Sequence, residues 1–445
     1  MSVTSELARY VVEARADALP DAVRREAMRA VLHLIGCAIG GCRHATVEAA
    51  LAALGDFAGK PQAGLIGRRE RLDVLNAALI DGIASHVLDF DDTHATCFVH
   101  PSGPVACALL PLAEYVDVSG ADFLNAFVLG VEVECRIAKA VIPAHYEIGW
   151  HLTGTAGVFG AAAAAGKLLG LDRQRMVWAL GIAATQSAGL RESFGSMCKS
   201  LHSGRAAQNG LSAALLARRG FTAAEQGIEG RRGFAHVAST TQNFAAITDG
   251  LGQSFELMRN TYKPFACGLV VHPTIDACLR LRAAHGLTEP QIERVDVAVH
   301  PIVLELTAKR TPRTGLEGKF SVFHSAAIAL IDGDAQEPQY SDARVTDPAV
   351  AGLTARVQAS ADPKMHKEAA TVTVTLRDGR RVETHVAHAV GSLEHPMSDA
   401  QIDAKVRGLA ADVIGAERTE ALIALCRDLW DRPDAGAVGR AAAAR

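Results

Sequence analysis

The densest group of chemically active side chains in this sequence is a short acidic segment with histidines behind it. It contains three aspartates within four positions, then a threonine and two histidines: Asp89, Asp91, Asp92, Thr93, His94 and His100. Carboxylates this close repel one another, and burial would raise their pKa values. The segment has two interpretations: a solvated helix end capped by aspartates, or a functional site that keeps the carboxylates together.

Two specific chemistries fit this segment. The letters DFDDT match the DxDxT nucleophile pattern of haloacid dehalogenase-type phosphohydrolases, which must stand at the end of a buried β-strand. The preceding letters, ALIDGIASHVL, are instead periodic as a helix. A metal site made of Asp91, His94 and His100 has suitable ligand types, but no HExxH pattern or paired i, i+4 spacing supports it. We therefore predict no metal ligands among the site residues.

Basic and imidazole side chains stand near the starts of predicted helices. His151 precedes a Gly/Ala-rich helix, where unpaired backbone N–H groups favour an anion. Lys199 and His202 precede a helix predicted to begin near Gly204, and Arg205 is close by. A helix start and a neighbouring positive charge lower the pKa of a lysine, which allows it to act as a base. The alternatives are a hydrogen-bonded capping histidine and an ordinary surface lysine.

A further lysine, Lys263, lies in the Pro- and Gly-shaped loop YKPFACG, where the pattern of the chain is about to change. Helical periodicity dominates before this loop, with predicted helices at 76–86, 103–116, 123–141, 157–170 and 204–219. After His272 the pattern predicts a helix at 275–285, a strand at 294–306, a loop-rich stretch at 332–363 and a hairpin at 370–388 around Asp378-Gly379. Helices are predicted again from Ser398. Clefts between domains are favoured binding sites, so Lys263 is a candidate ligand-binding residue.

These elements predict a mainly α fold. A large all-helical domain would comprise residues 1–268 plus 394–440, and a smaller inserted α+β lid domain would comprise 270–392. The chain of 445 residues is longer than a single hydrophobic core usually supports, which agrees with two domains. Abundant Ala and Gly predict helices that pack closely.

The composition narrows the class of function. Hydrophobic residues make up 49% and charged residues 21%, a globular balance, and the net charge of −4 provides no basic excess for nucleic acid. No apolar run reaches the roughly 18 residues of a membrane span, and the first residues do not resemble a secretory signal. Nine scattered cysteines indicate reduced thiols rather than a disulfide framework. We therefore expect a cytoplasmic protein with a small-molecule ligand, and neither a nucleic acid nor a membrane as partner.

Five segments, in order, carry a resemblance to a known family: HVLDFDDTH with HPS, GWHLTGTAGVFGAAAAAGKLLG, SMCKSLHSGRAAQNGLSAALLARRGFTA, YKPFACG with HPTIDA, and GKFSVFHSAA. Together they resemble the MmgE/PrpD family over about residues 5–430. The resemblance implies a helical domain with a smaller α+β lid, a homodimer, and chemistry on small polycarboxylic acids without a metal or organic cofactor. The family's active-site positions carry over to Asp89, Thr93, His100, His151, Lys199 and Lys263.

The chain also departs from the family pattern. A tyrosine common in the lyases of the family is replaced by His324. Some decarboxylases of the family have a histidine a few residues after the lysine of the fourth segment; here Gly268 lies near that place, and the next histidine is His272. Tyr146, in HYEIGWH, matches a tyrosine of the epimerase-like members and is a candidate proton donor. These departures weaken an assignment as a cis-aconitate decarboxylase.

The residues make chemical sense together. Removing a proton from carbon next to a carboxylate requires a base and stabilisation of the charge that develops. The candidate catalytic residues are His100, His151, Lys199, Tyr146 and Asp89, and the candidate substrate-binding residues are Thr93, Lys263, His202, Arg205 and His324. We expect His100, His151, Lys199 and Lys263 to converge in a cationic cleft.

Three functions remain open at this point. A cofactor-independent lyase, a dehydratase or decarboxylase of a small di- or tricarboxylic acid, is favoured. An epimerase or isomerase of an amino- or hydroxy-polycarboxylate is the alternative, and a metal-dependent phosphohydrolase is a remote one. A catalytically inactive scaffold would lack the Lys and His set, which this sequence retains.

Overall fold

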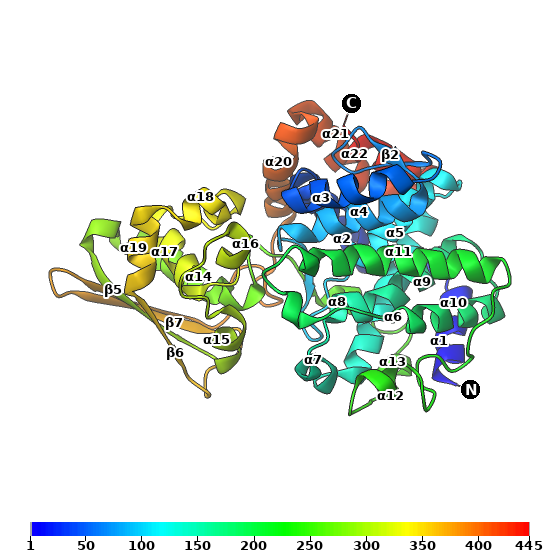
Figure 1. Ribbon diagram of the computed structural model, residues 1–445, viewed down its shortest axis with the longest axis horizontal. Coiled ribbons are helices and arrows are strands. Elements are labelled where there is room, and N and C mark those ends of the chain that lie inside the picture. Colours follow the sequence, from blue (N-terminus) through cyan, green and yellow to red (C-terminus); the bar gives the residue numbers. More distant parts are fainter. Residues whose placement is uncertain (1, 445) are drawn as a thin grey trace. The chain divides into compact units, whose positions relative to one another are not determined.

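The computed structural model describes residues 2–444, which divide into two compact units (Figure 1). The first unit contains the chain up to Val87, then Asp91–Thr261, and the chain from Ser398 onward. The second contains Tyr262–Met397 and three residues from much earlier in the sequence, Leu88–Phe90. The insert predicted from the sequence, 270–392, falls within Tyr262–Met397, whereas the inclusion of Leu88–Phe90 has no sequence signal.

Helices form almost all of the first unit. They are α1 Val3–Glu13, α2 Asp21–Gly41, α3 Ala45–Leu54, α4 Val74–Val87, α5 Ser102–Tyr115, α6 Gly120–Val141, α7 Ala144–Ile148, α8 Leu152–Thr155, α9 Gly157–Leu168, α10 Arg173–Thr185, α11 Cys198–Arg218, α12 Phe234–Ala238, α13 Ala245–Thr248, α20 Asp399–Ile414, α21 Ala416–Arg427 and α22 Gly436–Ala442. Two antiparallel pairs of two-residue strands accompany them: β1 Ala63–Gly64 with β2 Arg71–Leu72, and β3 Thr93–His94 with β4 Asn260–Thr261. The unit is therefore mainly, but not entirely, helical.

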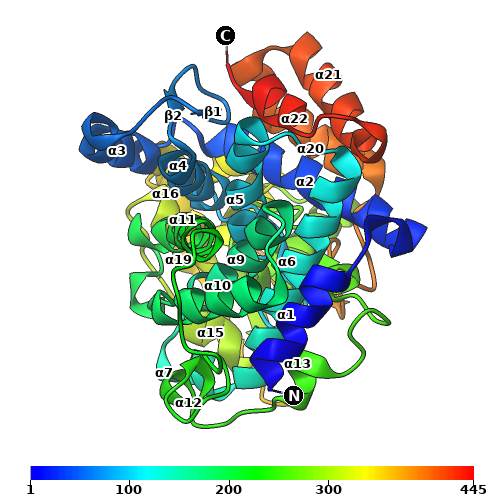
Figure 2. The ribbon, with the colours of Figure 1, turned by 90° about the vertical axis from the view of Figure 1, so that its right-hand side faces the viewer.

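Small side chains let the helices of the first unit approach closely, as the composition predicts. Figure 2 shows α9, α10 and α11 beside one another, and the five alanines 161–165 of α9 are fully buried. Gly82 of α4 faces Gly204 of α11, and a Cβ atom added to Gly82 would lie 2.5 Å from the Gly204 Cα. This glycine crossing brings the second half of α4 close to the first two turns of α11.

We expect Gly82→Ala to destabilise the protein by about 1–3 kcal/mol, because the added methyl group overpacks the crossing against backbone. Gly408→Ala is the matched control, since Gly408 lies in α20 with open space around an added Cβ. That control is expected to be neutral or stabilising by up to about 1 kcal/mol through helix propensity. Urea unfolding measures both free energies, and equal effects would contradict the packing argument.

A four-stranded sheet forms the centre of the second unit. Its strands are β5 Ile292–Val299, β6 Val357–Ala361, β7 Ala370–Leu376 and β8 Arg381–Val386, in the order β6-β5-β7-β8, with β5 and β6 parallel and the other pairs antiparallel. The helices of this unit are α14 His272–His285, α15 Pro301–Thr307, α16 Gly315–Gly318, α17 Val322–Ile331, α18 Asp342–Val345 and α19 Pro348–Arg356. Figure 1 shows α14, α17 and α19 along one face of the sheet.

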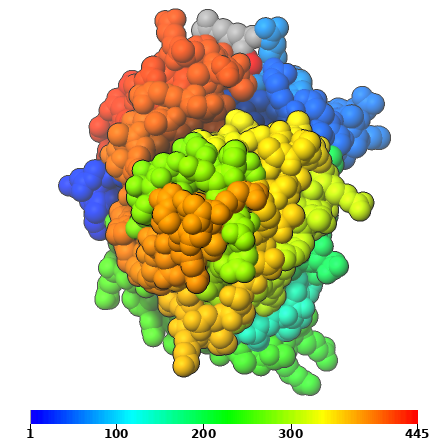
Figure 3. All heavy atoms as spheres, turned by 90° about the vertical axis from the view of Figure 1, so that its left-hand side faces the viewer, coloured from blue at the N-terminus to red at the C-terminus, as the bar shows by residue number. Residues whose placement is uncertain are grey.

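The predicted alternation along β5 is confirmed, because Val295, Val297 and Val299 are all buried. The predicted hairpin is also confirmed, and its turn lies beside the loop that links α14 to β5. There the Arg377 backbone N–H donates to the Gln291 carbonyl at 2.9 Å. Figure 3 shows this turn in orange next to the green residues of that loop.

Several predicted boundaries are wrong. Helix α11 begins at Cys198 instead of near Gly204, because Gly204 serves the crossing with α4 and is not a helix start. The strand predicted over 294–306 ends at Val299, where Pro301 opens α15. The stretch 332–363 contains α18, α19 and β6, which are short, and β6 buries only its first residue, so it shows no alternation.

Among the described residues, no single helix is long and apolar enough to cross a membrane. Only α2 taken together with the next helical stretch, Ala45–Phe57, passes such a test, and the two are bent by 81°.

Candidate active site

Four imidazoles and one lysine come together in the first unit, from four places in the sequence. His86 is the last residue but one of α4, His100 precedes α5, His151 precedes α8, and Lys199 and His202 lie three residues apart on one face of α11. All five side chains are buried. We refer to these five residues as the imidazole cluster. The rings of His86 and His151 stack with centroids 5.8 Å apart, and His100 meets His86 edge-on at 4.6 Å.

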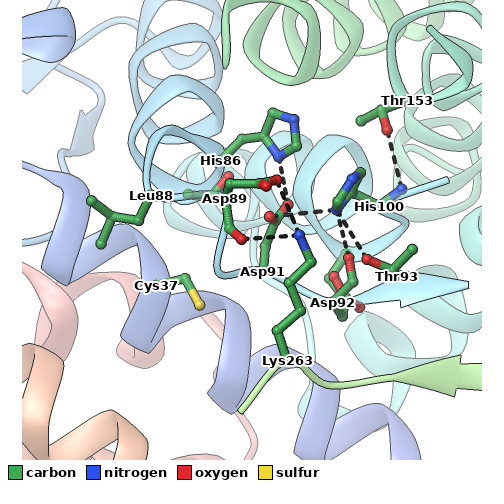
Figure 4. Close-up of polar contacts among 12 residues, drawn as sticks. Cys37, His86, Leu88, Asp89, Asp91, Asp92, Thr93, His100, Thr153 and Lys263 are labelled. Carbon is green, nitrogen blue, oxygen red and sulfur yellow. Dashed lines mark hydrogen bonds and ion pairs between the residues drawn. The ribbon is translucent and has the colours of Figure 1, made fainter. Parts of the chain in front are cut away.

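A chain of three charged and polar groups runs through the imidazole cluster. His86 Nδ1 lies 2.7 Å from Asp91 Oδ2, and His86 Nε2 lies 3.0 Å from Lys199 Nζ. Asp91 and His100 Nδ1 are 3.4 Å apart, so one carboxylate contacts two imidazoles (Figure 4). If Nδ1–H of His86 donates to Asp91, then Nε2 presents its lone pair to the Lys199 ammonium.

The pKa shifts follow from burial and from these neighbours. Burial lowers the pKa of His86 to about 3, with Lys199 acting in the same direction and Asp91 opposing it. Burial would raise the pKa of Asp91, but His86 and His100 hold it well below its usual range. Burial and the nearby Lys199 also lower the pKa of His151 far below normal. Near neutral pH the site therefore holds an Asp91 carboxylate and neutral His86 and His151 rings.

Local hydrogen bonds orient His100. Its Nδ1 lies 2.8 Å from the Asp92 carbonyl oxygen and 3.4 Å from Thr93 Oγ1, and its backbone N–H donates to Thr153 Oγ1 at 3.1 Å (Figure 4). These contacts assign the Nδ1–H tautomer, which makes Nε2 the acceptor nitrogen of the ring. Asp92 itself accepts from Ser102 and Asn260, and burial raises its pKa to about 7. Asp91 and Asp92 thus have different hydrogen-bonding partners, and the raised pKa of Asp92 reduces the repulsion between these two neighbouring carboxyl groups.

His151 has its own imidazole partner. Its Nδ1 lies 2.9 Å from His202 Nδ1, and the Phe194 ring meets it edge-on at 5.0 Å. One of the two Nδ1 atoms must carry a proton and the other must accept it, so both rings are constrained to defined tautomers. Burial, with Lys199 acting in the same direction, lowers the pKa of His202 to about 4.

Two predicted site residues pair within the second unit. Lys263 Nζ lies 3.0 Å from Asp89 Oδ1 and donates to the Asp89 carbonyl at 2.9 Å. Asp89 has a positive φ of 51°, a left-handed backbone that aspartate tolerates better than most residues. Both side chains are almost fully buried.

Three predicted site residues have surroundings that differ from the expectation. Arg205 is exposed and contacts Gln208, because six residues along α11 carry it off the face of Lys199. Tyr146, the candidate proton donor, lies in the short helix α7 and stacks under the Arg191 guanidinium, which is 3.9 Å from its ring centroid. His324 is buried in the second unit, where its Nε2 lies 3.0 Å from the Gln339 carbonyl oxygen.

The buried position of His324 predicts a pH-dependent contribution to stability. Burial lowers its pKa to about 4, so the folded chain keeps it neutral while the unfolded chain takes up a proton near pH 6.5. Stability is therefore lost as pH falls from 6.5 towards 4, by about 1.4 kcal/mol per unit. When the pH falls from 7 to 5, the unfolding free energy of wild type should decrease by about 2 kcal/mol more than that of His324→Gln. A difference that does not change with pH in chemical denaturation would contradict this.

The sequence did not single out His86 as a site residue, nor did it assign Asp91 to an imidazole. The sequence pattern places His86 at the end of an apolar helix. Its position three residues before the acidic segment is the only signal that could have indicated a role in the site. The proposed metal triad is not assembled, because His94 contacts Cys97 and Glu256 instead. The DFDDT letters follow α4 rather than a buried strand, and Thr93–His94 pairs antiparallel with β4. The phosphohydrolase interpretation therefore lacks its structural requirement.

The mainly helical unit thus buries a carboxylate–imidazole–lysine chain, an arrangement capable of acid–base chemistry. Residues 5–247 match the MmgE/PrpD N-terminal domain and residues 265–429 match the MmgE/PrpD C-terminal domain. The chain belongs to the MmgE/PrpD family.

Similar proteins cover nearly the whole chain. The cis-aconitate decarboxylase-like protein oryM of Aspergillus oryzae is 29% identical, over 94% of this chain and 92% of its own. The cis-aconitate decarboxylase of Homo sapiens is 26% identical, over 97% and 93% of the two chains. The cis-aconitate decarboxylase of Aspergillus terreus is 27% identical, over 94% and 91%.

Proposed function

We propose that this protein is a cofactor-independent lyase that removes carbon dioxide or water from a small di- or tricarboxylic acid. The observation that carries the proposal is the buried chain from Asp91 through His86 to Lys199, with His100 and His151 beside it. Such a chain can hold or move a proton at a defined nitrogen while keeping a cation next to a developing negative charge. The names of the relatives support decarboxylation as the first reaction to test.

Each residue then has a chemical task. Loss of carbon dioxide breaks a carbon–carbon bond and leaves its electron pair on carbon conjugated with a remaining carboxylate, and a proton must be delivered to complete the product. The Lys199 ammonium stabilises that charge, and His100 or His151 moves the proton. Dehydration uses the same parts in another order, because a proton next to a carboxylate is removed before hydroxide leaves.

The substrate carries negative charge, so we propose that its carboxylates bind to the buried cationic side chains. Lys199 is the buried cation of the imidazole cluster, so we propose that one substrate carboxylate binds there, with Thr93 and His202 as hydrogen-bonding neighbours. The family resemblance implies that Asp89 and Lys263 are active-site positions, and we propose that the ion pair between them serves the reaction.

Incubation of the protein in D₂O with cis-aconitate, with citrate-like acids and with single enantiomers of aspartate-derived acids tests the proposal. Proton NMR and carbon dioxide detection should show loss of carbon dioxide or water from at least one unsaturated or hydroxylated polycarboxylate. Inversion of an enantiomer with deuterium incorporation and no loss of either molecule would establish an epimerase instead. Activity that is lost on chelation while the melting temperature stays unchanged would also overturn the proposal.

A further inference from the structure

A second cluster of ligating atoms lies in the first unit, with no role in the chemistry proposed above. It comprises His94 of β3, Cys97 in the turn after it, and Cys135 of α6, all completely buried. One ligand atom from each lies within 4.8 Å of the other two, and His94 Nδ1 is 3.2 Å from Cys97 Sγ. We call these three residues the His–Cys–Cys cluster.

The separations suit a tetrahedral metal ion. Zinc binds cysteine sulfur at about 2.3 Å and histidine nitrogen at about 2.0 Å, which places neighbouring ligand atoms roughly 3.5–3.8 Å apart. Only shifts of a few tenths of an ångström separate the His94–Cys97 distance from that range. Two sulfurs and one imidazole nitrogen are also ligands that zinc prefers over calcium or magnesium.

The surroundings of His94 set the tautomer that a metal needs. Its Nε2 lies 3.2 Å from Glu256 Oε2, and Glu256 Oε1 accepts from Lys139 Nζ at 2.7 Å. At the other nitrogen, the Thr96 and Cys97 backbone N–H groups donate to Nδ1 over a long 3.3 and 3.4 Å, and Thr96 Oγ1 lies 3.3 Å away. A bound ion would replace these contacts. The proton therefore belongs on Nε2 and the lone pair on Nδ1. A carboxylate behind a metal-binding histidine is the usual arrangement in such sites.

We propose that His94, Cys97 and Cys135 bind one structural Zn²⁺, with water as the fourth ligand. Any proton held by the two cysteines or by His94 Nδ1 leaves to solvent on binding, so two thiolates, a neutral imidazole and a divalent ion form a neutral unit that tolerates burial. The sequence predicts no metal, because the two cysteines stand 38 positions apart and only the fold brings them together.

The proposed ion would act on a segment that matters for the active site. His94 and Cys97 lie between Thr93 and His100, and Phe98, next to Cys97, has a positive φ of 55°. A bond from this segment to Cys135 would fasten it to α6. The ion would thus hold the segment's backbone in place without taking part in the reaction.

Cobalt(II) replaces zinc in such sites and reports thiolate ligation by absorption. Reduced, metal-stripped protein should bind one Co²⁺ per chain and show a sulfur-to-cobalt charge-transfer band together with visible bands of tetrahedral intensity. Cys97→Ala and Cys135→Ala should each lose most of the charge-transfer intensity. Cys426→Ala is the matched control, since Cys426 is a buried cysteine of α21 in the same unit, and it should keep the full spectrum.

Two results would overturn the proposal. One is the absence of a charge-transfer band when one equivalent of Co²⁺ is added to wild type, and the other is an unchanged band in Cys97→Ala.

Wild-type protein provides a further test that needs no variant. Its melting temperature should rise with added Zn²⁺ and fall when a chelator is added, because binding to the native state stabilises it. A melting temperature that changes with neither Zn²⁺ nor the chelator would also contradict the proposed site.

Discussion

Replacing Lys199 with methionine is expected to lower turnover of the decarboxylated or dehydrated substrate by about 10²- to 10⁴-fold. Methionine fills a similar volume but removes the ammonium group that lies 3.0 Å from His86 Nε2. The active site then loses its cation beside the developing charge, and His86 loses a neighbour that keeps it neutral. Steady-state kinetics on the substrate identified by the D₂O screen measure the effect.

The chain offers a matched control for this substitution. Lys405 of α20 contacts His33 Nε2 at 2.7 Å, which is a lysine–imidazole pair of the same kind outside the imidazole cluster. Lys405→Met should leave kcat within about threefold of wild type, since it changes only a structural contact. If both variants lose activity equally, loss of the fold rather than of the acid–base group would explain Lys199→Met.

Asp91→Asn is expected to have an effect of similar size, a fall of about 10²- to 10⁴-fold in kcat. An asparagine can present its NH₂ group to His86 Nδ1, which drives the imidazole proton to Nε2. That nitrogen then faces the Lys199 ammonium, so two donors oppose each other where a donor and an acceptor stood. Asp91 contacts imidazoles, so we regard it as a positioning residue.

Two measurements separate this positioning role from simple destabilisation. Nitrogen NMR of the histidine side chains should show His86 change tautomer in Asp91→Asn, and the pH profile of kcat/KM should shift with it. Asp81→Asn on α4, the helix that carries His86, is the control. Burial raises the pKa of Asp81 to about 8, so the native side chain is already neutral and accepts the Ile66 N–H. An Asp81→Asn variant as inactive as Asp91→Asn would contradict the assignment.

The sequence predicted much of the helical unit because apolar periodicity is strongest in long buried helices. It also predicted His100, His151 and Lys199 as site residues, and the fold brings these three together. It missed His86 because one polar residue at the end of an apolar helix carries no chemical signal. It misjudged Arg205 because the helix start was taken to be Gly204, and the face of a residue depends on the correct phase. These errors concern long-range packing, which spacing along the chain does not encode.

The inclusion of Leu88–Phe90 in the second unit limits how this chain can be divided. Lys263 is satisfied by Asp89, and Lys319 donates to the Leu88 carbonyl at 2.6 Å. A fragment of residues 262–397 would remove Asp89 from Lys263 and the Leu88 carbonyl from Lys319, which would keep the Ala266 carbonyl and Glu337. Removing one partner of a buried ion pair is destabilising by about 3–5 kcal/mol. The smaller unit is thus not a module that recombination could exchange between relatives as one continuous gene segment. A domain swap would have to carry the acidic tripeptide of the donor along with it.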